Sequence, residues 1–188
     1  MIDLVAALGA VVGALDDAGA EYVVVGSVAG AAWGVARATR DVDIVTILTD
    51  DGLELLLTRL DPEAFYVPVA SAREAVATQR GTFNVLHAAS GGKVDLFIAR
   101  SDDAFTRSRL SRRVRVEVLG ITTWVATPED VVLAKLRWRL VTRSEVQWRD
   151  CVEVAAVNDL DLAYLDEWAP ELGVVDDLTE LLAAVGRV

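Results

Sequence analysis

The chain has 188 residues, of which 53% are hydrophobic and 25% are charged, and its formal net charge is -11 at pH 7. This length and apolar content suit one folded domain, or one core with a small appendage, and exclude a disordered chain. The single cysteine, Cys151, excludes an internal disulfide and a cysteine zinc cluster. No apolar run approaches the ~20 residues that cross a bilayer, and the first residues lack the basic region of a signal peptide, so we expect a cytoplasmic protein without membrane contact.

The basic residues are concentrated in the middle of the chain. Residues 100–149 hold 11 of the 18 Lys and Arg residues against 6 acidic ones, a local net charge of +5. The acidic chain as a whole argues against indiscriminate binding to nucleic acid, whereas the basic middle is compatible with a focused site for a triphosphate or an RNA end. Arginine stems that cover helix surfaces would give the same composition.

The first predicted elements are a helix, a strand and a glycine turn. Apolar residues recur at helical spacing over residues 2–17, and the pattern ends at Gly19. A β-branched strand follows over residues 22–25. Gly26 then permits a tight turn into a short helix, for which Ser27 is the predicted N-cap.

The remaining elements alternate between strands and helices before the chain becomes helical. A strand is predicted from Asp41 to residue 48, and a hairpin closes around a Gly-Gly turn. Thr127, followed by Pro128 and two acidic residues, is a helix start. Further strands are predicted over 82–88, 93–98, 114–118 and 121–125, and helices over 50–60, 71–80, 131–138, 145–154, 161–169 and 175–185. The pattern predicts an α/β fold with a mixed, mostly antiparallel sheet, helices on one main face, a core over residues 1–126 and a helical segment over residues 127–188.

Two carboxylates and a glycine turn are the first candidates for a functional site. Asp41 and Asp43 are one residue apart in a strand, so their side chains leave the same face and repel each other. A divalent cation held between them would remove that repulsion. Gly26 and Ser27 open a helix whose unpaired N–H groups and dipole favour a phosphate. Together they predict a site for a metal-nucleotide complex.

The spacing of these residues closely resembles a known signature. Gly-Ser, 13 residues and Asp-Val-Asp is similar to the pattern of the nucleotidyltransferase fold, the superfamily that includes DNA polymerase beta and many small bacterial transferases. In that fold a third carboxylate comes from a strand with an apolar-Asp-apolar setting, and Lys93-Val94-Asp95-Leu96 looks like it. Asp95 as a strand-edge residue without a role is the alternative.

The resemblance implies a division of roles among these residues. Asp41 and Asp43 would hold two Mg²⁺ ions, and Asp95 would bind the second ion and accept the proton of the acceptor hydroxyl. The implied substrate is a nucleoside triphosphate (NTP) such as ATP, with its β- and γ-phosphates held at Gly26 and Ser27. Further cations would neutralise the triphosphate, and the candidates are Lys135, Arg40 and Arg149.

The second half of the chain carries a narrower resemblance. Residues 127–136 and 147–150 look like the helical region of small bacterial nucleotidyltransferases of the abortive-infection toxin type, the AbiEii group. In that group a lysine and an aspartate on successive helices complete the active site, and Lys135 and Asp150 stand at the matching positions. A salt bridge between two helices is the alternative for this pair. The toxins of this group are usually longer, with a larger C-terminal domain for the acceptor.

The function implied by both resemblances is transfer of a nucleoside monophosphate to an acceptor hydroxyl. The acceptor would be an RNA or tRNA end or a protein, and a cognate toxin or antitoxin would be a partner. One alternative is an enzyme similar to aminoglycoside nucleotidyltransferases, which an open acidic cleft beside Asp95 would favour. The others are the antitoxin half of a toxin-antitoxin pair and a non-catalytic nucleotide-binding protein.

Overall fold

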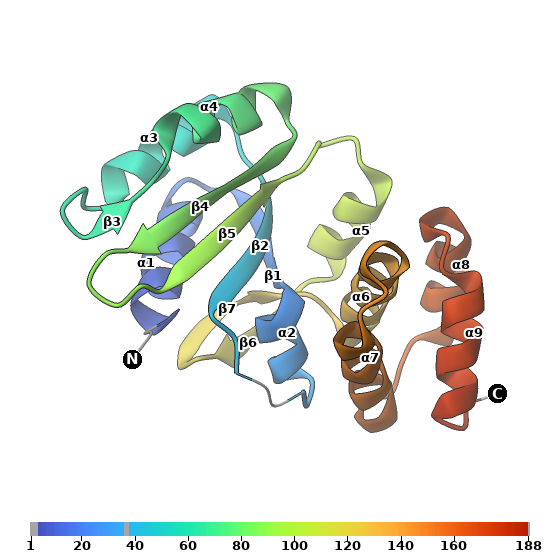
Figure 1. Ribbon diagram of the computed structural model, residues 1–188. Coiled ribbons are helices and arrows are strands. Elements are labelled where there is room, and N and C mark those ends of the chain that lie inside the picture. The colour runs from blue at the N-terminus through green and yellow to red at the C-terminus, as the bar shows by residue number, and fades with distance from the viewer. Residues whose placement is uncertain (1–3, 36–37, 188) are drawn as a thin grey trace.

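A computed structural model describes residues 4–35 and 38–187 and contains one sheet of seven strands in the order β3-β4-β5-β2-β1-β7-β6 (Figure 1). Neighbouring strands are antiparallel in four pairs, and the pairs β1–β7 and β2–β5 are parallel. The predicted mixed, mostly antiparallel sheet is therefore confirmed. The strands are β1 (Glu21–Val25), β2 (Asp41–Ile47), β3 (Phe65–Tyr66), β4 (Gly81–His87), β5 (Lys93–Ile98), β6 (Val114–Val118) and β7 (Ile121–Val125).

Helices cover the sheet and extend it to one side. Helices α1, α3 and α4 pack together and cover one face, while α2 packs against β1, β2 and α6 (Figure 1). Helices α6 to α9 form a group beyond α2. The helices are α1 (Leu4–Asp17), α2 (Gly26–Ala32), α3 (Asp50–Arg59), α4 (Val69–Thr78), α5 (Ala104–Arg112), α6 (Pro128–Thr142), α7 (Glu145–Val157), α8 (Leu162–Leu172) and α9 (Val175–Ala184).

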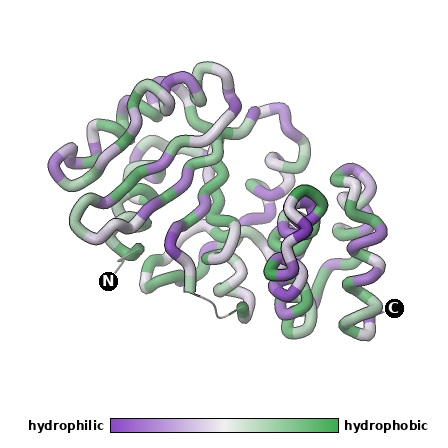
Figure 2. Tube along the Cα trace, viewed as in Figure 1, coloured by the Kyte–Doolittle hydropathy of each residue, from purple (hydrophilic) through white to green (hydrophobic). Residues whose placement is uncertain are grey.

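The alternation of side chains along β2 gives the sheet one apolar face and one functional face. Val42, Ile44 and Thr46 are fully buried, and α1 contacts this strand through its own buried stripe. Asp41 and Asp43 alternate with these residues and leave the opposite face. The tube is accordingly hydrophilic at the end of β2 nearest α2 and hydrophobic further along the strand (Figure 2).

Two elements were not predicted, and one helix start was predicted wrongly. Helix α5 is polar, and its start is marked by Asp103, whose side chain accepts a hydrogen bond from the Thr106 amide at 2.7 Å. Strand β3 has two residues and no periodicity to detect. Helix α2 begins at Gly26, with extended Val25 as its N-cap, so Ser27 lies inside the first turn and is not the cap.

The helical segment begins as predicted. The Thr127 hydroxyl accepts a hydrogen bond from the Asp130 amide, and Pro128 opens α6. Trp33, directly after α2, donates its indole N–H to the carbonyl of Ala126 at 2.7 Å and so ties α2 to the start of this segment. The boundary between residues 126 and 127 stays a prediction. Within residues 4–35 and 38–187, no helix is both long and apolar enough to cross a membrane.

Candidate active site at the start of strands β2 and β5

Strand register brings the three predicted carboxylates to one place. Asp43 is the direct neighbour of Asp95 across the parallel pair β2–β5, and Asp41 is the neighbour of Lys93. Residues in register on adjacent strands share a face of the sheet, so these four side chains leave the same surface. All four are partly buried. The sequence predicted the three aspartates and did not predict Lys93 as part of the site.

Gly26 lies against one of these carboxylates. Val25, the residue before it, is in register with Asp43, and Gly26 itself has φ +65°, which a glycine adopts at low cost. A Cβ atom on Gly26 would lie 2.1 Å from Asp43 Oδ2, an overlap that the carboxylate would have to relieve by moving. The predicted turn is therefore present, and its lack of a side chain leaves backbone directly beside the carboxylate.

Lys93 connects two of the three aspartates. Its Nζ lies 2.7 Å from Asp95 Oδ2 and 3.5 Å from Asp41 Oδ2. Asp41 is further held by the Thr39 hydroxyl, which donates to Asp41 Oδ1 at 3.2 Å. The signal for Lys93 was present in the sequence, because a residue two positions before Asp95 in a strand must share its face. The charge of Lys93 now compensates part of the negative charge of the cluster.

Asp43 has a shifted pKa. Burial, followed by the nearby charges of Asp41 and Asp95, raises the pKa of Asp43 to about 6, while Lys93 and Lys135 oppose this shift. Asp43 is therefore protonated more readily than an ordinary aspartate. A cation bound at this cluster would reverse the effect, because it would favour the ionised carboxylate.

The chemistry of the cluster fits a hard divalent cation. Its donors are carboxylate oxygens, which Mg²⁺ prefers, and one or two carboxylates are a usual protein contribution when substrate phosphates complete the coordination. Among the described residues, no group of three or more His, Cys, Asp or Glu side chains is arranged so that it could hold a metal ion by itself. Asp41 and Asp95 are instead joined through Lys93. The cluster therefore fits a cation whose remaining ligands come from the phosphates of a bound substrate.

Lys135 and Asp150 form a buried pair next to this cluster. Lys135 Nζ donates to Asp150 Oδ2 at 2.8 Å and to Gln147 Oε1 at 3.2 Å, and the two charged side chains are 5% and 1% exposed. The Lys135 side chain also lies against α2, since a Cβ on Gly30 would be 3.7 Å from Lys135 Cε. The pair is a salt bridge between α6 and α7, the alternative considered for it. The charge of Lys135 nevertheless opposes the rise in the pKa of Asp43.

The two predicted arginines lie outside this cluster. Arg149 is exposed on α7, with its Nε 3.9 Å from Glu153 Oε1 one turn further along the helix. Arg40 is exposed on the segment that leads into β2. The structure thus brings together Gly26, the three aspartates and Lys93, and it brings Lys135 to Asp150 without bringing either arginine to the carboxylates.

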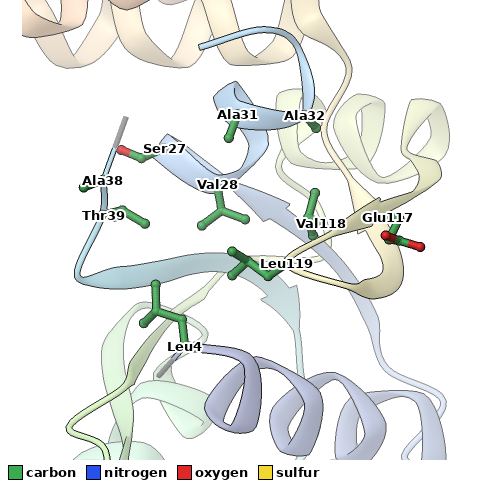
Figure 3. A pocket seen from close by; sticks show the side chains of 10 residues that line it. All are labelled: Leu4, Ser27, Val28, Ala31, Ala32, Ala38, Thr39, Glu117, Val118 and Leu119. Atoms are coloured by element: carbon green, nitrogen blue, oxygen red, sulfur yellow. The ribbon is translucent and has the colours of Figure 1, made fainter. Parts of the chain in front are cut away.

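A hollow of about 390 Å³ lies beside α2 (Figure 3). Ser27 and Thr39 lie at its edge, and Glu117 is its charged residue. Its other lining residues are apolar: Leu4, Val28, Ala31, Ala32, Ala38, Val118 and Leu119. The hollow offers no pair of carboxylates for a metal ion, so we place the candidate metal site at the carboxylate cluster, which this hollow adjoins through Ser27 and Thr39.

Comparison with solved structures places the fold. An antigenic nucleotidyltransferase-like protein from Paracoccidioides brasiliensis superimposes with a TM-score of 0.57 at 18% identity, covering 95% of this chain and 91% of the other. The chain therefore has the nucleotidyltransferase fold. The lincosamide antibiotic adenylyltransferase LnuA, solved with lincomycin bound, matches with a TM-score of 0.50 at 12% identity over 84% of this chain and 99% of its own. The antibiotic-resistance factor ANT(2'')-Ia matches with a TM-score of 0.50 at 11% identity, covering 95% and 87%.

Sequence comparison adds nothing to this likeness. No protein-family profile matches the chain, and no curated protein matches it. The nucleotidyltransferase fold predicted from Gly26, Ser27 and the aspartates is confirmed at the level of architecture. The narrower resemblance to the AbiEii group stays a prediction.

Proposed function

We propose that the protein is a nucleotidyltransferase that moves a nucleoside monophosphate from an NTP to an acceptor hydroxyl and releases pyrophosphate. The observation that carries this proposal is the register of Asp43 with Asp95, directly beside the Gly26 turn. A phosphate-binding turn, a carboxylate pair and a third carboxylate on the next strand are the parts that this reaction needs. The nucleotidyltransferase fold supports this chemistry by analogy with other proteins of the same fold.

The chain's own groups divide the reaction between binding and proton transfer. Asp41 and Asp43 would hold Mg²⁺ on the triphosphate, and Asp95 would contribute to a second Mg²⁺. When bound, such ions neutralise the phosphate charge and lower the pKa of the acceptor hydroxyl. The acceptor oxygen forms a bond to the α-phosphorus as the bond to pyrophosphate breaks, and Asp95 accepts the proton. The backbone at Gly26 and Ser27 would orient the β- and γ-phosphates.

The test is incubation with each labelled NTP in turn, with Mg²⁺ and a cell lysate as the source of acceptor. We expect label in one class of product, RNA, protein or small molecule, for the wild type. We expect none for Asp41→Asn with Asp43→Asn, which keeps the shape of both side chains. Transfer by the double variant at the wild-type rate would exclude the carboxylate pair as the metal site.

A small-molecule acceptor is the second candidate function. It is favoured by two proteins of similar fold, a lincosamide antibiotic adenylyltransferase and an antibiotic-resistance factor, the first of which is covered over 99% of its length. Transfer of label to an aminoglycoside or a lincosamide in the same assay would select it. A role in a toxin-antitoxin pair stays a prediction, which growth arrest on expression, and its relief by a neighbouring gene, would test.

A further inference from the structure

A hollow of about 270 Å³ lies where β5 ends and α5 begins, and α6 contributes Arg137 to its lining. Four arginines from four separate segments line it: Arg80 before β4, Arg100 after β5, Arg109 in α5 and Arg137 in α6. Asp103 is the carboxylate in the lining. In a chain with a net charge of -11, four guanidinium groups around one hollow form a local centre of positive charge.

Three of these four arginines form no ion pair within the described part of the chain, although the charges of Asp130 and Asp103 act on Arg109. Arg100 forms an ion pair with Asp102. Arg80, Arg109 and Arg137 form no ion pair with the described carboxylates at 4.0 Å or less. Arg109 donates to the Thr106 hydroxyl at 3.1 Å, yet its Nε is buried without a hydrogen-bond partner among these residues. A buried guanidinium N–H without an acceptor is costly, and an anion in the hollow would supply one.

The arginines also repel one another. Burial lowers the pKa of Arg109, the charges of Asp130 and Asp103 oppose this shift, and the smaller effect of Arg137 adds to it. Like charges around one hollow cost free energy, and an anion between them would offset part of that cost. Guanidinium groups bind phosphate in bidentate fashion, so several of them around one hollow are suited to a phosphate group.

The hollow lies at the end of β5, and the carboxylate cluster lies nearer the start of the same strand. Asp95 and Phe97 share one face of this strand, and the Phe97 side chain is 40% exposed. Ile98, in the lining of the hollow, follows Asp95 by three residues, or about 10 Å at the rise of a strand, and leaves the opposite face, so an acceptor would have to pass the end of β5 to enter the hollow. An acceptor with its hydroxyl at Asp95 could stack a ring on Phe97 and reach the arginines with a phosphate.

We propose that this arginine hollow is a second anion site, separate from the Gly26 turn, and that it binds a phosphate group of the acceptor. The proposal rests on the proposed function, because it takes Asp95 as the reacting end of the acceptor path. The phosphate belongs either to the backbone of a nucleic acid strand or to a small phosphorylated acceptor. A polycationic acceptor such as an aminoglycoside would be repelled from this end of the path.

The test measures binding in EDTA without NTP, so that transfer is not required. The ligands are a fluorescein-labelled single-stranded RNA of twelve nucleotides and, separately, a nucleoside monophosphate. The variant is Arg80→Gln with Arg137→Gln, since both side chains are exposed. The matched control is Arg73→Gln with Arg107→Gln, which removes the same charge from exposed arginines that are paired with Glu54 and Glu21.

We expect the hollow variant to lose about 10-fold or more in affinity and the control to lose less than about 2-fold. For RNA, the slope of log K against log salt concentration should fall by about 1.4, because each phosphate contact on a single strand contributes about 0.7. Loss of RNA binding assigns a nucleic acid strand, and loss of monophosphate binding alone assigns a small acceptor. Equal affinities of both variants for both ligands, or no binding of either ligand to the wild type, would overturn the proposal.

A parallel measurement separates this proposal from the proposed function. Asp41→Asn with Asp43→Asn should lose Mg²⁺-ATP binding and keep RNA or monophosphate binding, whereas the hollow variant should do the reverse. Loss of Mg²⁺-ATP binding in the hollow variant would make the hollow part of the triphosphate site and would overturn its assignment to the acceptor. A wild type that binds phosphate at the hollow and transfers no nucleotide would remove the proposed function and with it the acceptor role of the hollow, and would leave the anion site.

Discussion

The ammonium group of Lys93 lies 2.7 Å from Asp95 Oδ2 and 3.5 Å from Asp41 Oδ2, so one side-chain cation joins two of the three carboxylates. Hydrogen bonding to Asp95 is the main cause that raises the pKa of Lys93, which keeps the amine charged. A divalent cation at Asp41 or Asp95 therefore competes with Lys93 or shares the carboxylates with it. Without a bound metal, the charge of Lys93 therefore reduces the repulsion among the three carboxylates.

Lys93→Met should destabilise the metal-free protein and strengthen metal binding. Removing the ammonium leaves three carboxylates without their nearest counter-charge, so in EDTA we expect Tm to fall by about 2–4 °C for each kcal/mol lost. Because more negative charge is then available, Mg²⁺ should raise Tm more in the variant than in the wild type. Thermal unfolding in EDTA and in a Mg²⁺ series measures both effects. Lys93→Arg, which keeps the charge, is the control, and weaker Mg²⁺ stabilisation in Lys93→Met would contradict the expected competition.

The raised pKa of Asp43 predicts a pH dependence of stability. The folded protein holds the Asp43 proton up to about pH 6, whereas the unfolded chain releases it near 3.8. Folding therefore loses stability as the pH rises between these values, and the loss is complete above pH 6. Asp43→Asn removes the effect, so at pH 7.5 the metal-free variant should be more stable than the wild type, on the order of 1–2 kcal/mol after allowance for partial exposure. Urea unfolding in EDTA at pH 4.5 and 7.5 tests this, and a difference that does not change with pH would contradict it.

Gly26→Ala should abolish nucleotide binding. The new Cβ would meet Asp43 Oδ2 at 2.1 Å and would force the carboxylate away from the turn. Gly173→Ala is the matched control, because Gly173 also has a positive φ, +70°, and a Cβ there meets nothing within 4 Å. Both substitutions should cost about 1–2 kcal/mol of stability from the left-handed backbone, and only Gly26→Ala should lose Mg²⁺-ATP binding in calorimetry. Unchanged ATP affinity in Gly26→Ala would remove the turn from the site.

Lys135 should matter for stability as well as for the nucleotide. Lys135→Met removes the buried ammonium that donates to Asp150 Oδ2 at 2.8 Å, which should cost up to about 3–5 kcal/mol. The double variant with Asp150→Asn should recover much of that loss, and it allows kinetics to be measured on a folded protein. If Lys135 also acts on the triphosphate, the double variant should show a raised KM for the NTP. A KM equal to that of the wild type would leave Lys135 as a structural residue.

The sequence predicted what short-range patterns determine. The turn at Gly26, the shared face of Asp41 and Asp43 and the Thr127 cap each depend on neighbouring residues, and all three are present. Helix α5 was missed because its apolar positions are few, although its cap, Asp103, was visible. Ser27 was predicted wrongly as a cap because residue type alone does not fix which residue ends the strand.

Contacts between distant elements lay beyond the sequence patterns. The pairing of Lys93 with Asp41 depends on the order of β2 and β5 in the sheet, which local periodicity does not determine. The arginine hollow is a similar case. Three of its arginines belong to the basic middle of the chain, and Arg80 comes from a segment some twenty residues earlier that only the fold brings beside them. Composition indicated an anionic ligand without indicating where it binds.

The roles of Asp95 and the metal pair should separate in kinetics. If Asp95 accepts the proton while Asp41 and Asp43 hold the triphosphate, Asp95→Asn should keep NTP affinity within a few-fold and reduce kcat by about 10²-fold or more. The substitution also frees Lys93 from its closest partner, so the effect of Lys93 must be removed from the comparison. Asp95→Asn in the Lys93→Met background does this, because no ammonium then remains to move.

The same loss of kcat in both backgrounds would assign it to the carboxylate itself. A kcat that recovers in the double variant would mean that the freed Lys93 inhibits, by occupying the place of a cation. An equal loss of NTP affinity in Asp95→Asn and in Asp41→Asn with Asp43→Asn would instead make Asp95 a primary ligand of the nucleotide-bound metal. The acceptor proton would then leave to solvent or to the substrate, and the reaction would depend on positioning more than on a protein base.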